Sequence, residues 1–262
     1  MRSLIPILLA VVVLSSGCDP DGYSCNSEEC YADDNNPQYQ TLEDCNSLCN
    51  EPKLGGCGSL VLYEDYLYST VQIGSQCWFA ENCRYLPEVS PSSAGSDASP
   101  YYYVYGYEGT DVGVAQATIH YDTYGALYNW PAVMTEGICP SGWHIPSDSE
   151  WQTMEVSLGM SESEASSTSF RGSPVGDYMK STSGWNNDGN GSNSSSFNGI
   201  PGGFRGDWSN TFEGLGNYGY WWSSSEDNIQ DSWYRFLLNQ TDDGYRGSYV
   251  NSGGFSARCV RD

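Results

Sequence analysis

The sequence predicts an α+β fold, because three kinds of segment alternate along it without internal repeats. Short runs that alternate apolar and polar residues are typical of strands. Two stretches with apolar residues at helical spacing are typical of helices, and long stretches rich in Gly, Ser and Asn are typical of loops. The 262 residues include 30 glycines, 21 tyrosines and nine tryptophans, a composition unlike that of a helical bundle. The length suffices for one domain of about 200 residues with a small appendage.

The chain begins with a pattern typical of a lipoprotein export signal. One basic residue, Arg2, precedes an apolar run over residues 4–14, and small residues at 15–17 stand directly before Cys18. The run is too short to span a bilayer stably and matches the core of a secretory signal. Because the junction resembles the bacterial lipobox, we expect residues 1–17 to be removed and Cys18 to be lipidated. The protein would then be anchored in the membrane by its N-terminal lipid, at the outer membrane or cell surface; the alternative is a plain secretion signal.

The acidity of the chain restricts its partners. Its formal charge is -23, from 33 acidic residues against ten Lys plus Arg, and removal of Arg2 with the export signal would leave -24. Such a surface repels phosphate backbones, so we expect no nucleic-acid partner. It is compatible with a well-solvated outer surface or with divalent cations.

Residues 18–53 are predicted to form a small acidic, cysteine-rich stalk. Nine acidic residues and no Lys or Arg lie within 18–52. Thr41 starts a capping-box-like pattern that predicts a helix with two cysteines one turn apart, which two further cysteines would reach from a preceding hairpin. Two disulfides between hairpin and helix would hold a module too short to bury much core. The four cysteines are Cys25, Cys30, Cys45 and Cys49.

Residues 54–262 are predicted to form one domain that begins and ends with strands. Residues 60–82 alternate apolar and polar side chains and predict two short strands that meet at a turn. Residues 91–100 predict a loop, and the aromatic run 101–107 predicts a strand or a surface ridge. Short closing strands are expected at YWWSSS, WYRFLLN and FSARCV.

Two helices are expected between these strands. The stronger signal is a capping box formed by Ser147 and Glu150, after which apolar residues follow at helical spacing until Gly159. The weaker signal is helical spacing over residues 124–135, where Pro131 would sit awkwardly in the interior.

Six blocks stand out along the domain: VQIGSQCWFAEN, TYGALYNWPA, CPSGWHIPSDSEW, FNGIPGGFR, GYWWSSS and SARCV. In order and spacing they resemble the Fibrobacter succinogenes major paralogous domain, over roughly residues 58–262. The resemblance implies a C-type lectin-like domain, similar in fold to the formylglycine-generating enzymes and found on exported, often lipid-anchored bacterial proteins. It implies no activity, because none is assigned to the family.

The cysteines of the domain are expected to form disulfides, because export places them in an oxidising compartment. The resemblance implies a bond between Cys139 and Cys259. Cys77 and Cys83 flank a short turn and are expected to pair, although a bond from Cys57 to either is nearly as well supported. Apart from the lipidated cysteine, nine of the ten remain, so at least one thiol is free or paired between chains.

The segment CPSGWHIPSDSEW contains the parts of a Cys–His nucleophilic pair. Cys139 would be the nucleophile, His144 the base, and Asp148 or Glu150 the acid that orients it. We favour the alternative, in which a disulfide removes the nucleophile and His144 is a hydrogen-bonded structural residue. The formylglycine-generating relatives use a cysteine pair near the C-terminus to hold copper, whereas Cys259 stands alone there, so no catalytic residue is inferred.

Other catalytic patterns are weaker. Residues 214–219 match GxGxxG, but a strand pattern follows where a phosphate site needs a helix N-terminus. The serines at 223–225 are expected to support backbone structure. His120 lies in a polar, tyrosine-rich stretch and is expected to face solvent.

Calcium is the one cofactor that the sequence suggests. Residues 186–193 supply hard oxygen ligands in a loop with glycines, and Asp188 and Asn190 are the candidate ligands. The loop has one carboxylate where an EF-hand has several. The alternative is a turn network of Asn and Gly held by side-chain to backbone bonds.

Tryptophans in the loop-rich half are candidates for ligand contact, because aromatic rings stack on sugar faces. Trp185 and Trp208 are the candidates for exposure, whereas one of Trp221 and Trp222 should point inward because neighbours alternate on a strand. We therefore expect a non-catalytic binding, adhesion or structural role, with a surface glycan or another envelope protein as partner. The alternative is a diverged enzyme of the formylglycine-generating type.

Overall fold

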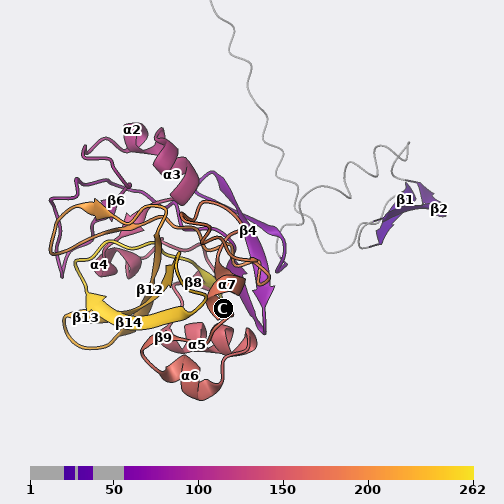
Figure 1. Ribbon diagram of the computed structural model, residues 1–262. Coiled ribbons are helices and arrows are strands. Elements are labelled where there is room, and N and C mark those ends of the chain that lie inside the picture. Colours follow the sequence, from indigo (N-terminus) through magenta and orange to yellow (C-terminus); the bar gives the residue numbers. More distant parts are fainter. Residues whose placement is uncertain (1–20, 27–28, 38–55) are drawn as a thin grey trace, which may run out of the picture. The chain divides into compact units, whose positions relative to one another are not determined.

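The computed structural model describes residues 21–26, 29–37 and 56–262 and has two compact units, Met1–Lys53 and Leu54–Asp262 (Figure 1). In the described part of the chain, no helix combines the length and apolar character needed to cross a membrane.

In the first unit, β1 (Asp21–Asn26) and β2 (Glu29–Pro37) pair antiparallel, with Cys25 opposite Cys30. The expected hairpin is confirmed. The export signal, Cys18, the helix from Thr41 and the pairing partners Cys45 and Cys49 lie outside the described residues.

A five-stranded sheet in the order β3-β4-β5-β15-β8 forms one part of the second unit. Segment 60–82 supplies three of these strands rather than two, because tight turns at Glu64–Asp65 and at Gly74 reverse the chain twice. All three turn residues have positive φ. The strands are β3 (Leu60–Tyr63), β4 (Tyr66–Ile73), β5 (Gln76–Phe79), β15 (Val260–Arg261) and β8 (Trp143–His144).

A four-stranded sheet in the order β12-β13-β14-β9 forms the other part. One face carries aromatic residues, with Tyr220 stacked on Phe236 at 4.5 Å between ring centroids. Trp221 and Trp222 point to opposite faces, and both are fully buried. The expectation that one of them points inward is met, and the other is buried as well because both faces of this strand are covered. The strands are β12 (Tyr218–Glu226), β13 (Asp231–Leu238), β14 (Gly244–Val250) and β9 (Ser169–Arg171).

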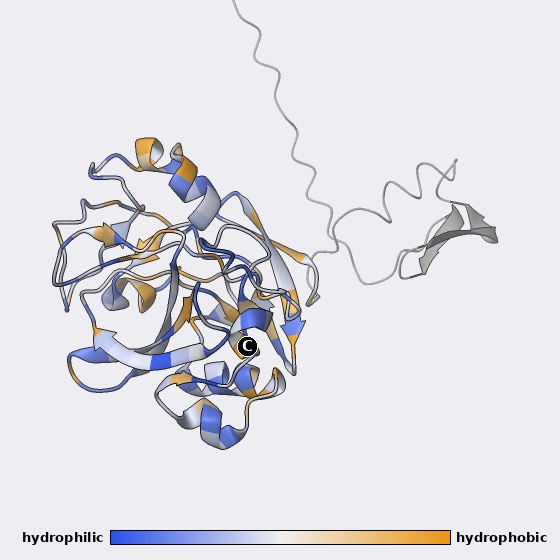
Figure 2. Cartoon of the chain, viewed as in Figure 1, coloured by the Kyte–Doolittle hydropathy of each residue, from blue (hydrophilic) through white to orange (hydrophobic). Residues whose placement is uncertain are grey.

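Four of the helices lie in pairs on two sides of the domain (Figure 1). Figure 1 shows α2 and α3 at one side and α5 and α6 at the opposite side, and Figure 2 shows hydrophobic positions among hydrophilic ones in these helices. Two short strand pairs, β6 with β7 and β10 with β11, complete the unit. The helices are α2 (Val112–Gln116), α3 (Ile119–Tyr124), α4 (Trp130–Val133), α5 (Asp148–Ser157), α6 (Glu162–Ser166) and α7 (Val175–Met179). The strand pairs are β6 (Tyr102–Tyr103), β7 (Leu127–Tyr128), β10 (Phe204–Arg205) and β11 (Phe212–Glu213).

Helix α5 is confirmed with its cap, whereas the helix expected over 124–135 is largely wrong. In α5, the hydroxyl of Ser147 accepts from the backbone N–H of Glu150, and the Glu150 carboxylate accepts from that of Ser147. In the second region only the single turn α4 is helical. Pro131 lies in its first turn, where a missing N–H costs nothing, and not in a helix interior.

A buried ionic network joins α5 to the four-stranded sheet. The Arg235 guanidinium lies 2.8 Å from two carboxylates of the helix, those of Asp148 and Glu155. Arg246 contacts Asp148 at 2.7 Å, and Arg171 contacts Glu155 at 2.8 Å. Burial opposes ionisation of Asp148, but the bonds from Arg246 and Arg235 prevail and lower its pKa. The network therefore holds its charges in a dry interior by pairing them.

Candidate functional site

Cys139, the candidate nucleophile, forms a disulfide. Its sulfur is bonded to that of Cys259, 120 residues further along, as the resemblance implies. The bond ties the loop before β8 to the segment that enters β15. A sulfur held in this way offers no thiolate for attack.

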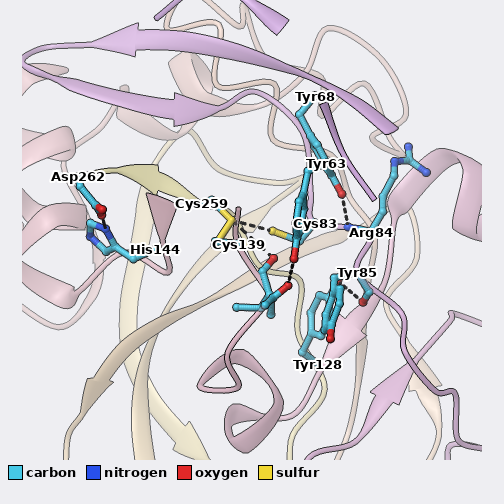
Figure 3. The surroundings of a disulfide bond; sticks show 12 residues. Tyr63, Tyr68, Cys83, Arg84, Tyr85, Tyr128, Cys139, His144, Cys259 and Asp262 are labelled. Atoms are coloured by element: carbon cyan, nitrogen blue, oxygen red, sulfur yellow. Dashed lines mark hydrogen bonds and ion pairs between the residues drawn. A yellow bond between two sulfur atoms is a disulfide. The ribbon is translucent and has the colours of Figure 1, made fainter. Parts of the chain in front are cut away.

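The second disulfide joins Cys57 to Cys77, so the expected pairing of Cys77 with Cys83 is wrong. Cys77 lies on β5 opposite Gln72 of β4, whereas Cys83 lies beyond the end of β5 and is buried in the core. Cys83 is a fully buried free thiol. Its sulfur lies 3.5 Å from that of Cys259 (Figure 3).

The Cys83 thiol is protonated at neutral pH. Burial raises its pKa to about 12, although the nearby Arg258 guanidinium opposes the shift. Within the described residues, the sulfurs of Cys83, Cys139 and Cys259 form the one group of three or more His, Cys, Asp or Glu ligand atoms close enough to share a metal ion. Because two of the three are bonded to each other, the group presents a single thiol.

His144 is a structural tie, as the sequence indicates. Its Nδ1 lies 2.6 Å from Asp262 Oδ1, and its Nε2 lies 2.8 Å from Glu150 Oε1. Burial lowers the pKa of His144, but the hydrogen bonds that its ring donates to the carboxylates of Asp262 and Glu150 outweigh burial and raise it. Asp148, the other candidate for orienting this ring, instead pairs with arginines of the sheet. In Figure 3 the His144–Asp262 pair lies apart from the three sulfurs.

The other weak catalytic patterns have structural roles. The GxGxxG residues form a turn with positive φ at Gly214 and Gly216, and strand β12 follows. The hydroxyl of Ser225 accepts from the backbone N–H of Asp148. His120 is half-buried, with Nδ1 2.9 Å from the Tyr105 carbonyl, so the expectation of a solvent-facing histidine is wrong.

The candidate calcium loop contains a turn network. The side-chain oxygen of Asn190 accepts from the backbone N–H of Trp185 at 3.0 Å. Asp188 is exposed, with φ of 57°, in a turn closed by the bond from Gly189 N–H to the Asn186 carbonyl. These contacts match the turn-network alternative, and calcium at Asp188 and Asn190 stays a prediction.

The two candidate ligand tryptophans have opposite environments. Trp185 is 4% exposed, and its indole N–H donates to the Ser181 hydroxyl and the Gly199 carbonyl, so its proposed exposure is wrong. The loop around it folds back because its polar residues bond to each other. Trp208 is 94% exposed, which agrees with its expected position at the surface.

Trp208 lies at the tip of a hairpin that its neighbours hold in one shape. The hairpin joins β10 to β11, and the bond from Gly206 N–H to the Thr211 carbonyl closes its loop at 3.0 Å. Arg205, buried at the base, donates to Asn210 Oδ1 within the loop and to the Ser92 carbonyl outside it. A rigid support beneath a fully exposed ring reduces the entropy that a contact with a ligand would cost.

The supporting residues of this hairpin were missed by sequence reasoning. Arg205 is 1% exposed in a chain with only ten Lys plus Arg, and a cation within the apolar block FNGIPGGFR is the signal that could have found it. Its partners at Ser92 and Ser252 lie 113 and 47 residues away, which no local pattern indicates.

These features define a disulfide-tied α+β domain with mixed short helices and strands, in which the conspicuous exposed side chain is an aromatic ring on a fixed hairpin. The model of the Fibrobacter succinogenes major domain matches residues 71–261, and the chain belongs to this family. Comparisons with curated proteins and with solved structures give no match.

Proposed function

We propose that the protein is an exported lipoprotein, anchored in the cell envelope through Cys18, that binds a ligand at the cell surface without catalysis. Its domain would be of the C-type lectin-like class. The partner would be a surface glycan or another envelope protein. The observation that carries the proposal is the 94% exposure of Trp208 on a hairpin that buried Arg205 fixes.

The surroundings of Trp208 support ligand contact over a structural role. A tryptophan that leaves its apolar surface in water forgoes about 2–3 kcal/mol of burial, so the position is costly unless a ligand covers it. Tryptophan is also enriched among residues that dominate binding energy. In the same hairpin the Ser209 hydroxyl donates to the Glu213 carboxylate, and both groups are of a kind that can bond to ligand hydroxyls instead.

The sulfur chemistry supports the non-catalytic part of the proposal. Cys139 is bonded to Cys259, and burial raises the pKa of the Cys83 thiol to about 12. Neither provides the accessible thiolate that covalent catalysis by cysteine requires.

The binding proposal is tested with the fragment 54–262, which contains both hydrophobic cores and both described disulfides. It is screened on a glycan array and against envelope fractions, with and without EDTA. Trp208→Ala should weaken binding at least tenfold. Ile229→Ala removes another side chain that is 92% exposed, from a different turn, and should leave binding unchanged. Equal binding by both variants contradicts a role for Trp208.

The anchor is tested in cells. Cys18→Ala should abolish incorporation of labelled palmitate and release the protein from the membrane fraction. A variant that remains membrane-bound without the label contradicts lipid anchoring at Cys18. Residue Cys25, changed to Ala, is the matched control.

A further inference from the structure

Two adjacent clefts meet at Trp143. The larger has a volume of about 680 Å³ and the smaller about 340 Å³, and Ser141 and Trp143 line both. Trp143 therefore stands where the clefts join, and together they form a groove that runs over its side chain. We call this surface the Trp143 groove.

Trp143 is held firmly while part of it remains accessible. It belongs to β8, where it pairs with Arg261 of β15, and its ring packs on Phe79 with centroids 4.8 Å apart. The residue is half-buried. Its indole N–H has no hydrogen-bond partner among the described residues, and it is not one of the buried unsatisfied groups, so it is accessible to solvent.

The larger cleft combines apolar walls with free polar groups. Tyr63, Ile138 and Ile145 contribute aromatic and aliphatic surface. Glu136 and Ser224 also line it, and within the described part of the chain neither side chain has a hydrogen-bond partner. Pockets that bind small ligands have this character: mostly apolar lining with a few polar groups that fix orientation.

The charge and shape of the groove select among ligands. Glu136 lines the larger cleft and Arg261 lines the smaller one, so the groove has no excess of either charge and suits a neutral ligand. An indole face, an indole N–H, hydroxyls and an unpaired carboxylate suit a sugar ring, which presents an apolar face and many hydroxyls. Two clefts on either side of Trp143 provide room for more than one ring.

We propose that the Trp143 groove binds a neutral oligosaccharide of at least two sugar rings, with one ring packed on Trp143. The proposal rests on the proposed binding function but assigns it a site separate from Trp208. The polar groups expected to contact sugar hydroxyls are Glu136, Ser141 and Ser224.

The test uses the full chain purified in detergent. It is titrated calorimetrically with neutral oligomers of one to five units of glucose, galactose, mannose, xylose or N-acetylglucosamine. One series should bind, with affinity rising at least tenfold from one ring to two or three. Trp143→Ala should reduce that affinity at least tenfold, and Trp143→Phe should retain most of it.

A second variant tests the groove in case Trp143→Ala does not fold. Ser141 is exposed and lines both clefts, so Ser141→Tyr should obstruct the groove without touching the core and should abolish binding. Ser93→Tyr adds the same ring at an exposed serine outside both clefts and should bind normally. Circular dichroism and thermal melting verify that each variant is folded.

Each other outcome overturns the groove proposal. Sugar binding that Trp208→Ala abolishes and Ser141→Tyr leaves intact would place the ligand at the hairpin, so the binding function would stand without the groove. If the protein captured an envelope protein and bound no sugar, the binding function would likewise stand and the groove proposal would be wrong. Equal affinity for one ring and for three would contradict a site that spans both clefts.

Discussion

Which sulfur pairs with Cys259 depends on one side chain. Cys83 lies 3.5 Å from Cys259 and is kept from it by Cys139. When Cys139→Ser is refolded with oxidised and reduced glutathione, we expect a Cys83–Cys259 bond to form, with oxidised glutathione accepting the two electrons and two protons. Peptide mapping of a non-reduced digest detects it.

The matched control for this pairing is Cys83→Ser, which should retain the Cys139–Cys259 bond. If Cys139→Ser left both remaining cysteines open to alkylation after refolding, the two side chains could not reach bonding geometry and the prediction would be wrong.

His144 makes stability depend on pH in a defined direction. Its pKa is raised in the folded protein, so its contribution is fully present below the ordinary pKa of about 6.5 and is lost as pH rises through the folded-state value. The pKa of Glu150 is lowered, because bonds from Ser147 and His144 outweigh burial. Its contribution is present above about 4.5 and is lost as pH falls below that.

Replacement of His144 should therefore matter at pH 6 and little at pH 9. His144→Gln should lower the free energy of unfolding at pH 6 by up to about 1 kcal/mol, the scale of a partly exposed ion pair. Urea titrations at both pH values measure the difference. A larger loss of unfolding free energy at pH 9 than at pH 6 would contradict this prediction, because it would mean that the neutral ring is the stabilising form.

At the scale of elements, we expect the ionic network between α5 and the four-stranded sheet to make a large contribution to the free energy of unfolding. Glu155 is 1% exposed and binds two arginines, so Glu155→Gln leaves Arg171 and Arg235 without its charge. We expect a loss of about 3–5 kcal/mol in the free energy of unfolding, measured with urea. Glu162→Gln makes the same change at an exposed site on α6 and should cost less than about 0.5 kcal/mol. Similar losses in both variants would show that the buried pairs add little.

Elements defined by local signals were predictable, and elements defined by distant partners were not. The capping box of α5 lies within four residues, so the sequence predicts it fully. The turn at Glu64–Asp65 lacks the Asn-Gly or Asp-Gly signal of a tight hairpin, so the sequence predicts two strands where the structure has three. The arginines that bind Asp148 lie 87 and 98 residues away, and no pattern in the helix indicates them.

In the candidate sites, too, features that depend on distant residues could not be predicted from local sequence. Trp185 and Trp208 lie in similar loop sequences, but the backbone around Trp185 turns inward because Asn190 bonds to it. The Trp143 groove gathers Tyr63, Glu136, Ser141 and Ser224 from separate segments. Their proximity is a property of the folded chain, so sequence alone could not predict the groove.

For the whole molecule, the two disulfides should contribute unequally to stability. The Cys57–Cys77 loop spans 20 residues and the Cys139–Cys259 loop spans 120. Loop-closure entropy then gives about 3 kcal/mol for the first bond and about 5 kcal/mol for the second. Urea unfolding of the two double-alanine variants should reproduce this order. Cys83→Ala serves as control for loss of a sulfur without loss of a bond, and a reversed order would contradict the entropic explanation.

The place of β15 between β5 and β8 delays completion of the sheet during synthesis. Phe79, at the end of β5, and Arg258, which donates to its carbonyl just before β15, are 179 residues apart. At translation rates of about 5–20 residues per second, a growing chain waits roughly 10–35 s between making the first and the last of these strands. During that interval the sheet lacks the strand that joins β5 to β8. Because the strand that joins β5 to β8 is also the last strand to be synthesised, the sheet cannot close until nearly the whole domain has been made.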